Sequence, residues 1–312
     1  MATFRGLAPE TLEPFVSAIY FKEFEQQPLL YPEIFNNKPT KLAFVDEFTV
    51  AGLGRFVQKP EGTPVAFSDP VQGDRRRTIV LTFALGFRVT MEMREDEQHG
   101  IIAQMPSDLA LAARDSMDRF AWALYNVAFT AADDTANTGL PEGDGVRRSL
   151  FDTGHVPLRN PGATQSNRLN PGVALSTAGM ETALTIFYTQ ESEEERYINV
   201  APNKLVIHPT ESFVAAQLLE SEKEVNTAEN QINTINRSRI GVSPCQSPYV
   251  TDTDSWCLMD TTKSPLDWID RKGLTGPERS TDSQSFDTMF ISHFRAAVQI
   301  NGNWRSAVGS AP

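Results

Sequence analysis

The chain has 312 residues, of which 40% are hydrophobic and 22% are charged, and its formal net charge at pH 7 is −12. This length and composition are typical of a folded protein with one large or two modest domains, and they exclude wholesale disorder. The acidic balance disfavours a protein that reads nucleic-acid sequence, because such proteins cluster Lys and Arg against phosphates.

The sequence also bounds the environment of the chain. Its two cysteines, Cys245 and Cys257, are too few for a disulfide framework, so a reducing, cytosolic environment is expected. The first residues, MATFRGLAPE, lack a basic segment followed by an apolar run, and no stretch of about 18 uncharged apolar residues occurs. We therefore expect neither a secretion signal nor a membrane span.

Residues 1–47 are predicted to form an extended arm. They mix Pro, aromatic residues and short apolar runs without sustained periodicity, apart from a predicted helix at Pro9–Glu25. A first strand is predicted at Phe48–Val57. The Pro- and Gly-rich residues 58–77 that follow are predicted to be the tip and return of a long hairpin.

Residues 78–94 carry the strongest strand pattern in the chain. The odd-numbered positions share one face and are all apolar: Ile79, Leu81, Phe83, Leu85, Phe87, Val89, Met91 and Met93. A single strand of this length would extend about 50 Å at about 3.3 Å per residue, well beyond ordinary strands. Its apolar face needs a covering surface, and we expect another copy of the chain to supply it.

The longest helix is predicted at 107–131, with Ser107 as its N-cap. Its apolar residues form two stripes, one with Leu109, Ala113, Met117, Phe120, Leu124 and Val127 and one with Trp122, Tyr125 and Phe129. Arg114 with Asp118, and Asp115 with Arg119, have the spacing of ion pairs along a helix. A helix that is apolar on two sides is predicted to lie between layers.

The second half of the chain alternates helix and strand after a loop-rich region at 133–175. Helices are predicted at Thr177–Tyr188 and Thr210–Ser221, with a Thr cap on the second, and strands at Lys204–His208 and Asp254–Met259. This alternation indicates a compact mixed domain. A last strand, predicted from Phe286 to Ile300, is expected to return to the sheet near the long helix.

Four segments stand in a characteristic order: YPEIF at 31–35, LGFRVTMEMREDE at 85–97, YNVAF at 125–129 and PNKLVIHP at 202–209. Together they resemble the major capsid proteins of tailed bacteriophages, most of all the Mu-like major head subunit group. The resemblance implies an α+β tailed-phage major capsid fold. Its implied parts are an N-terminal arm at 1–47, an extended β-hairpin loop at 48–94, a peripheral domain with a spine helix at 95–175, an axial domain at 176–280 and a C-terminal strand at 281–312 that returns to the peripheral domain.

The same resemblance implies a function in assembly. Copies of the chain are expected to form hexamers and pentamers of an icosahedral phage head that encloses double-stranded DNA, contacted non-specifically and without a membrane. Separate scaffold, portal and decoration proteins are its implied partners, and the virion capsid, assembled in the host cytoplasm, its location. Some members carry a cleavable N-terminal scaffold segment, which we expect this chain to lack. An encapsulin-like shell with protein cargo and a soluble hydrolase with an unrecognised site are the alternatives.

The residues expected at contacts between copies are Phe56, Lys59, Arg75, Arg76, Arg77, Phe83, Glu193, Glu194 and Glu195. The basic run at 75–77 is either a solvated loop or a set of side chains that meets carboxylates of a neighbouring subunit. The acidic run at 193–195 is either its partner or another solvated loop. Lys59 lies near the predicted hairpin tip, but no matched Asn and activating Glu are recognisable, so we expect no isopeptide crosslink.

No catalytic, cofactor or metal site is predicted. The four histidines, at 99, 155, 208 and 293, have no metal-ligand spacing, and the two cysteines lack a nearby His that would mark a nucleophile. Asp252, Asp254 and Asp260 lack the Gly that a calcium loop requires. Nucleotide-binding and hydrolase motifs such as GxGxxG and GxSxG are missing as well. The sequence therefore predicts a structural protein rather than an enzyme.

Overall fold

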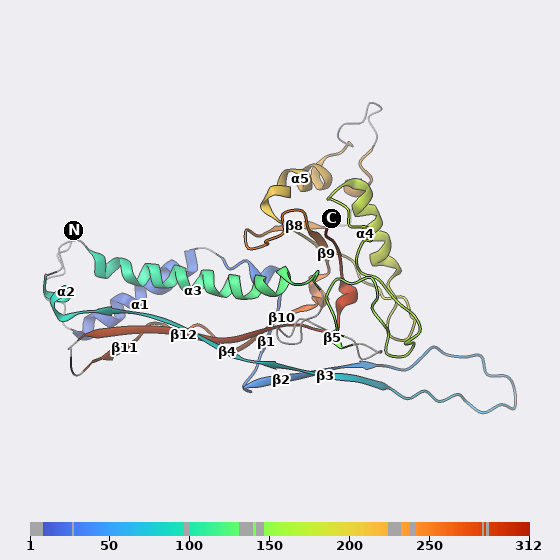
Figure 1. Cartoon of the computed structure of the whole chain (residues 1–312), viewed down its shortest axis with the longest axis horizontal. Helices are drawn as coiled ribbons and strands as arrows, with labels where there is room; N and C mark the ends of the chain where they lie inside the picture. The colour runs from blue at the N-terminus through green and yellow to red at the C-terminus, as the bar shows by residue number, and fades with distance from the viewer. Residues whose placement is uncertain are drawn as a thin grey trace.

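The fold is that of a computed structural model, which describes residues 9–26, 28–96, 100–130, 140–141, 147–223, 232–237, 241–282, 284 and 287–312. Residues 1–8 of the predicted arm, most of 133–146, His99 and Phe286 lie outside the described residues. Figure 1 shows an elongated body in which a long helix runs along a sheet, a second sheet with its own helices stands at one end, and a hairpin projects beyond it.

The first sheet has five strands, and its central strand comes from the end of the chain. β12 (Thr288–Ile300) pairs antiparallel with β4 (Leu81–Val89) on one edge and with β10 (Leu266–Lys272) and β11 (Glu278–Thr281) on the other; β1 (Asn36–Pro39) runs parallel to β10. Phe290 and Phe294 of β12 are buried, whereas Ile291 between them is exposed. The predicted alternation of the last strand is thus confirmed over 288–296. It fails at 297–299, where Ala297 and Gln299 are buried and Val298 is half-buried, because the hairpin root covers the other face of β12 there.

The second sheet has the order β13 (Ala307–Ser310), β9 (Trp256–Met259), β7 (Lys204–Ile207) and β8 (Ser243–Gln246). Helices α4 (Thr177–Thr189) and α5 (Ser212–Glu220) pack on it, with Phe187, Leu205, Trp256 and Val308 in one core. The predicted helices and strands of this region are confirmed. β13 joins this sheet after the chain has left the first one, whereas β10 lies in the first sheet.

Short elements lie between the longer helices and strands. They are η1 (Tyr31–Glu33), α2 (Met91–Asp96), β5 (Leu140–Pro141), β6 (Arg147–Arg148), η3 (Pro209–Glu211), α6 (Thr234–Arg237), η4 (Thr261–Lys263) and η5 (Trp304–Ser306). The predicted Thr cap of α5 is wrong, because Thr210 lies inside η3. His208 caps that turn instead, with its Nδ1 accepting a hydrogen bond from the Thr210 amide at 3.2 Å.

The long helix α3 spans Ile101–Asn126 and begins ahead of the predicted cap at Ser107. Gly100, at φ 72°, precedes it, and Pro106 lies inside it although proline removes a backbone donor. The extra first turn is stabilised by burial, because Ile102 packs in a cluster with Val16, Val89 and Phe290. The helix also ends before the predicted residue 131.

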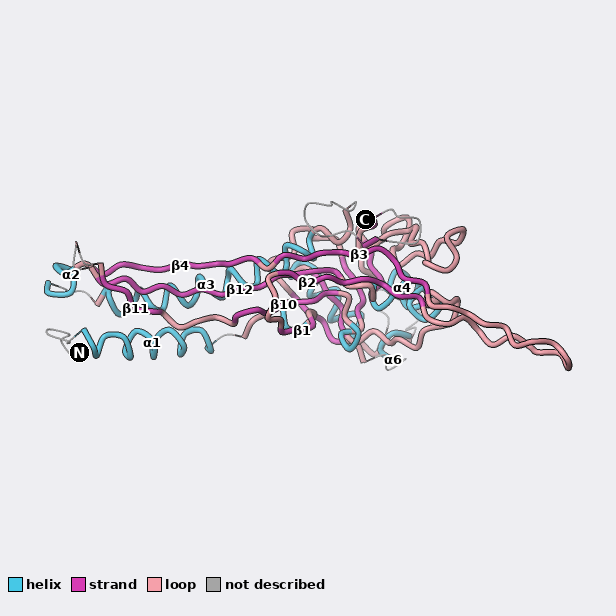
Figure 2. Tube along the Cα trace, turned by 90° about the horizontal axis from the view of Figure 1, so that it is seen from below, coloured by secondary structure: helices cyan, strands magenta, loops and turns pink. Residues whose placement is uncertain are grey.

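The two apolar sides of α3 are confirmed, since the helix contacts three different layers. Leu109 packs against Tyr20 of helix α1 (Pro9–Gln26), which confirms the predicted N-terminal helix. Phe120 lies 4.7 Å from the Phe83 ring in the first sheet, measured between centroids. Tyr125 donates a hydrogen bond to Cys257 of the second sheet at 3.4 Å. Figure 2 shows α1 and α3 running along the same sheet.

Asp118 ties the N-terminal segment to α3. Its Oδ1 accepts hydrogen bonds from the backbone amides of Leu30 and Tyr31, both at 3.0 Å, and Tyr31 stacks on Trp268 with ring centroids 4.3 Å apart. Of the two predicted helical ion pairs, Asp115–Arg119 is confirmed at 2.6 Å. Arg114 also acts on Asp118, since its charge lowers the pKa of that carboxyl, and Asp118 in addition accepts hydrogen bonds from the backbone of another element.

The prediction of one continuous strand at 78–94 is wrong. β3 (Val71–Ile79) ends before Val80, β4 follows it, and residues 91–94 belong to α2. Phe83, Phe87 and Val89 of β4 pack against the chain's own helices and β12, so their cover is intramolecular. Val80 packs instead with Ile269 and Ala297. The inward face switches at Val80 because the chain there leaves the sheet plane and crosses to the opposite face of the first sheet.

The root of the hairpin covers that opposite face. β2 (Phe44–Ala51) pairs antiparallel with β3, from Phe44 opposite Ile79 to Ala51 opposite Val71. The strand predicted at 48–57 therefore starts and ends earlier, and residues 52–70 have no regular strand or helix. Near the end of the ladder the register shifts between Phe48 and Val50, as at a β-bulge.

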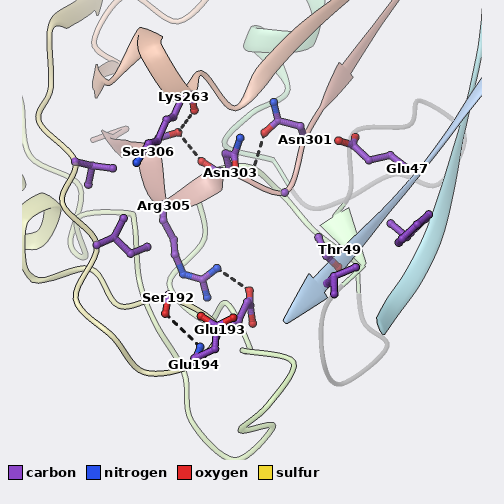
Figure 3. A pocket seen from close by; sticks show the side chains of 15 residues that line it. Glu47, Thr49, Ser192, Glu193, Glu194, Lys263, Asn301, Asn303, Arg305 and Ser306 are labelled. Atoms are coloured by element: carbon purple, nitrogen blue, oxygen red, sulfur yellow. Dashed lines mark hydrogen bonds and ion pairs between the residues drawn. The ribbon is translucent and has the colours of Figure 1, made fainter. Parts of the chain in front are cut away.

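Packing beneath the hairpin root is incomplete. A cavity of about 330 Å³ lies between β2 and the loops around residues 192–200 and 301–306. Phe48 and Val50 line it on the hairpin side, and Glu194, Asn303 and Arg305 line it on the body side. Figure 3 shows the Arg305 side chain reaching from the body towards Glu193.

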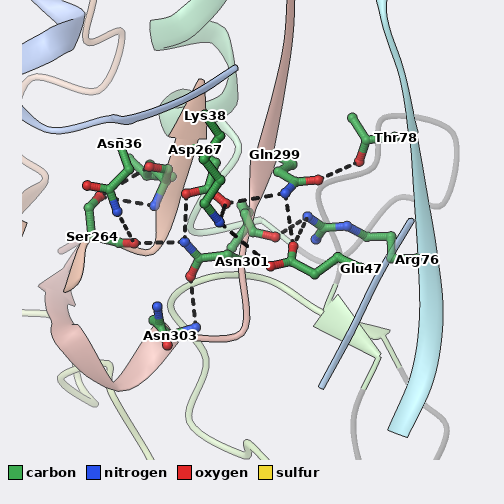
Figure 4. Close-up of polar contacts among 12 residues, drawn as sticks. Asn36, Lys38, Glu47, Arg76, Thr78, Ser264, Asp267, Gln299, Asn301 and Asn303 are labelled. Carbon is green, nitrogen blue, oxygen red and sulfur yellow. Dashed lines mark hydrogen bonds and ion pairs between the residues drawn. The ribbon is translucent and has the colours of Figure 1, made fainter. Parts of the chain in front are cut away.

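A buried polar network holds the hairpin root to the first sheet (Figure 4). Gln299 of β12 donates to Glu47 at 2.9 Å and accepts from Thr78 at 2.9 Å. Arg76, only 3% exposed, donates to the Ile300 carbonyl and lies 4.0 Å from Glu47. Because buried polar groups are costly when unpaired, this network fixes which side chains of β2 and β3 meet β12.

Replacement of Asp118 is expected to loosen the N-terminal segment. In D118A the amides of Leu30 and Tyr31 lose their acceptor, so the free energy of unfolding should fall by about 1–3 kcal/mol. D118N keeps an acceptor oxygen and should lose less. Urea unfolding of unassembled subunits measures both, and equal losses in D118A and D118N would contradict the role of the side-chain oxygen.

Asp118 also predicts a pH dependence. Burial raises the pKa of its carboxyl above the ordinary value, although the hydrogen bonds from the Tyr31 and Leu30 amides lower it. A raised folded pKa means that the stability from this group is complete below the unfolded pKa and is lost as the pH rises through the folded pKa. As the pH rises above about 3.9, the urea midpoint of the wild type should therefore fall relative to that of D118N. A pH-independent difference between the two would count against this assignment.

Arg76 and Arg75 are expected to differ although they are neighbours. R76A removes the bond to the Ile300 carbonyl inside a buried network and should lower the free energy of unfolding by about 1–3 kcal/mol. R75A is the matched control, because the Arg75 side chain is largely exposed, and it should change stability by less than about 0.5 kcal/mol. Urea midpoints of the two variants test the difference; equal midpoints would be incompatible with the network.

Candidate functional site

The candidate functional site is the free part of the hairpin, residues 52–70. These residues run side by side away from the body in both views (Figures 1 and 2). At the tip, the Thr63 amide donates to the Pro60 carbonyl at 3.3 Å, and Gly62 has φ 80°, the left-handed value that a type II turn needs. The Pro- and Gly-rich sequence thus folds into two extended arms joined by a tight turn, as predicted.

The two arms carry large apolar side chains that nothing in the described chain covers. Phe67 is 93% exposed and Phe56 is fully exposed, and Leu53, Val57 and Val65 are exposed as well. A soluble monomer rarely exposes this much contiguous apolar surface, and surfaces of this kind mark contacts with other proteins. The arms therefore have the composition of an interface rather than of a solvated loop.

Backbone groups of the arms are free as well. Within the described residues 53–68, the hydrogen bonds are those of the tip turn and one from the Gly54 amide to Ser68 Oγ at 3.4 Å. An extended segment with unpaired N–H and C=O groups is suited to add to the edge of another sheet. Phe56 and Lys59, both predicted contact residues, lie in this segment.

The basic run lies on β3 and not in a loop. Arg77 forms a two-pronged hydrogen bond with Asp46 at 2.7 and 2.9 Å, and Arg75 lies 3.5 Å from the same carboxylate. The hydrogen bond from Arg77 is the main reason that the pKa of Asp46 is lowered. Arg76 is buried in the network at the root. The solvated-loop interpretation is therefore wrong, and contact with another copy stays a prediction for Arg75 and Arg77.

The acidic run makes several contacts within its own chain. Glu193 accepts from Arg305 at 2.6 Å and from the Leu158 amide at 2.6 Å. Glu194 accepts from the amide of Gly52, at the start of the free hairpin, and Glu195 accepts from Asn160 at 2.8 Å. Within one chain the structure does not bring the basic and acidic runs together, and their contact across copies stays a prediction.

Two further findings concern residues that sequence reasoning placed wrongly or missed. Phe83 is half-buried and packs against the core of its own chain, stacked on Phe294 with ring centroids 4.9 Å apart, so we do not propose it as a contact residue. Arg159 was missed; it donates to the carbonyls of Gly52 at 2.9 Å and of Asp69. A single Arg in the turn-rich segment LRNPG gave no signal of these partners.

Three titratable side chains away from the hairpin, those of His155, Cys245 and Cys257, are buried. No group of three or more His, Cys, Asp or Glu side chains in the described ranges is arranged to hold a metal ion. His155 is buried and stacks on Trp304, with ring centroids 3.8 Å apart. Burial raises the pKa of both the Cys245 and the Cys257 thiols to about 12, which disfavours the reactive thiolate. None of the described helices is both long and apolar enough to cross a membrane.

Solved structures with the same fold are capsids and a virus-like particle. The capsid of Ralstonia phage GP4 has a TM-score of 0.54, with 13% identity over 88% of this chain and 86% of that chain. The capsid of Myoviridae phage XM1 has a TM-score of 0.52, with 12% identity over 99% and 95%. The virus-like particle from Pyrococcus furiosus has a TM-score of 0.53, with 9% identity over 96% and 98%. At these identities the likeness shows the fold alone, which is the predicted mixed helix and sheet fold of tailed-phage capsids.

Comparison at the level of sequence identifies the family. No curated protein matches the chain. A family model described as phage capsid protein matches residues 75–309, from β3 to β13 and therefore across both sheets and α3. Since the match covers well over half of the sequence, the chain belongs to the phage capsid protein family and is a structural major capsid protein.

Proposed function

We propose that copies of this chain assemble as hexamers and pentamers into the icosahedral head of a tailed phage, around packaged double-stranded DNA. The observation that carries this proposal is the free hairpin, whose apolar arms have no cover within the described chain. Each copy lays its hairpin on a neighbour, and each neighbour does the same to the next. Contacts of this head-to-tail kind close into rings, so one sequence is sufficient for both hexamers and pentamers.

Apolar burial drives the contact, at about 25 cal/mol for each Å² removed from water. Unpaired backbone groups of the arms add hydrogen bonds where they meet a neighbouring sheet. Arg75 and Arg77, whose side chains remain about half exposed, and the exposed Glu195 are proposed to make polar contacts between copies. We also propose that Lys59 forms no covalent crosslink.

We propose the predicted division of the chain into functional parts, adjusted to the sheets. The free hairpin at 52–70 reaches other copies. The arm at 1–47 instead packs α1 on α3 and pairs β1 with β10 of its own chain, and β4 of the 48–94 segment belongs to the first sheet. The first sheet with α3 is the peripheral part, and the second sheet with α4 and α5 is the axial part. The axial assignment is supported by a core that belongs to the second sheet with α4 and α5 alone. The largest core spans both sheets, with Val206 and Cys257 of the second beside Trp268 and Phe294 of the first, and β10 and β13 show that the chain passes between the sheets more often than the linear division suggests.

The net charge of the chain and its family support proposals about DNA contact, partner proteins and the place of assembly. With a net charge of −12, the subunit tolerates nearby DNA without binding it tightly, so contact with the packaged DNA is non-specific. Assembly takes place in the host cytoplasm with separate scaffold, portal and decoration proteins. The subunit is proposed to have no enzymatic activity, which agrees with its buried thiols.

A second candidate function is a protein compartment of the encapsulin type. The similar fold of the Pyrococcus furiosus virus-like particle favours it. The contents of purified particles distinguish the two candidates, because particles from infected cells should contain DNA under the first proposal and a packaged protein under the second.

Replacement of both exposed phenylalanines at the hairpin is expected to prevent assembly. Each ring contributes about 1.5–3 kcal/mol when it becomes fully buried, and F56S/F67S removes two rings from every contact. F56L/F67L keeps large apolar side chains and is the matched control. Negative-stain microscopy and sedimentation of the expressed chains should show shells for the wild type and the control but folded, unassembled subunits for F56S/F67S. Normal shells from F56S/F67S would remove the proposed role of the hairpin.

A further inference from the structure

The β2–β3 ladder ends at Ala51 opposite Val71, and the free hairpin starts there. Its direction is therefore set by whatever holds the first residues beyond the ladder. Those residues are Gly52 on the outgoing arm and Asp69 on the returning arm. Two loops of the body hold these residues, and we call the two loops together the clasp. The loop at 158–160 contacts both Gly52 and Asp69, and the loop at 192–196 contacts Gly52.

Arg159 is the part of the clasp that holds both arms. Its Nε donates to the Gly52 carbonyl at 2.9 Å, and a terminal nitrogen of the same guanidinium donates to the Asp69 carbonyl. The planar guanidinium fixes the relative positions of two acceptors, which a single ammonium group does not. One side chain thus spans the two arms at the point where they leave the body.

Glu194 holds the outgoing arm from a second loop. Its Oε1 accepts from the Gly52 amide, and Arg196 donates to its other oxygen at 3.1 Å. Burial raises the pKa of Glu194, but the hydrogen bonds from Ser192, Arg196 and Gly52 outweigh it and leave the pKa lowered, so the carboxylate is charged at neutral pH. Gly52 is consequently bound through both its N–H and its C=O.

The clasp is itself fixed to the core of the body. The Leu158 amide and Arg305 both donate to Glu193, each at 2.6 Å, which joins the two loops to the end of the chain. Arg305 also donates to Gln165 at 3.1 Å and lies over the Trp304 ring, 4.1 Å from its centroid. The Arg305–Glu193 pair is largely buried, so the loops do not move independently of the body.

Side-chain packing does not fix the hairpin direction on its own. The cavity of about 330 Å³ lies directly under the root, between β2 and the 192–194 loop. Nearby, Thr49 Oγ1 is buried without a hydrogen-bond partner among the described residues. With open space beneath the root, the hydrogen bonds of Arg159 and Glu194 are the contacts that resist a swing of the arms.

We propose that Arg159 and Glu194 are positioning residues that set the angle between hairpin and body, and through that angle the curvature of the assembled shell. The inference rests on the proposed function, in which each hairpin lies on a neighbouring copy. In a shell built from one repeated contact, an error in the angle of that contact is repeated at every subunit. A loosened clasp therefore leaves the contact intact but makes its geometry variable.

The test compares R159A and E194A with the wild type, with R159K as the conservative variant and R119A as a control that removes the same charge from an exposed site on α3. Hydrogen exchange on subunits reports whether the clasp holds the root. The amide of Gly52 should exchange about fivefold faster in E194A, as expected for the loss of one hydrogen bond. Electron microscopy of the assembled products reports the distribution of diameters and the share of open or irregular particles.

We expect R159A and E194A to assemble into particles of mixed diameter and incomplete closure, R159K to lie between them and the wild type, and R119A to match the wild type. Uniform shells of wild-type diameter from R159A would overturn the inference. Complete loss of assembly in R159A would overturn it too, because the clasp would then be needed for the contact rather than for its angle. Failure of the proposed function is recognised separately, by a wild-type chain that forms no shells.

Discussion

Apolar side chains that the described part of the chain leaves uncovered impose the main constraint on this molecule. Phe56, Val57, Val65 and Phe67 project from two extended arms with few internal hydrogen bonds. In an isolated subunit these arms cost free energy through both exposed apolar area and ordering of the backbone. The cost is recovered only when the arms are buried against another molecule, which links the conformation of one subunit to the presence of others.

The rest of the subunit is organised to present these arms from a stiff base. The first sheet is covered on one face by α1 and α3 and on the other, at one end, by the hairpin root. Much of the contact at the root is polar, through Arg76, Glu47 and Gln299. Apolar side chains alone allow one strand to slide along another, whereas a hydrogen-bonded network favours a single register. Buried polar side chains at the root contribute less to stability than apolar ones of the same size, but they define the position of the root more narrowly.

Sequence patterns predicted the elements well and their junctions poorly. The alternation of Phe290, Phe294 and Ile300 and the helical spacing around α3 and α4 reflect burial that is periodic along the chain, so they are visible in one dimension. The position of the break at Val80 was not visible, because Ile79, Val80 and Leu81 are all apolar and only the three-dimensional structure decides which of them is covered. Pro106 suggested a helix start, but burial of Ile102 extended the helix through it.

In the candidate site, too, local features were predictable from the sequence and contacts between distant residues were not. The Pro- and Gly-rich segment around Gly62 and the exposed aromatic residues indicated a projecting hairpin, because turn chemistry is local. Partners such as Arg159 with Gly52, or Glu193 with Arg305, are far apart in sequence and consist of common surface residue types. Charge runs suggested a pairing between copies, whereas nearby Asp46 and Glu47 already accompany the arginines within one chain.

The position of β12 in the sequence has a consequence for biosynthesis. β4 and the hairpin are made early, but the strand on which they dock is among the last to leave the ribosome. A nascent chain therefore exposes the apolar hairpin arms before the sheet that holds the hairpin root is complete. That sheet forms only after β12 has been translated, near the end of synthesis. Under the proposed function, the hairpin is therefore held in its final direction, ready for contact with other copies, only when each newly made chain is complete.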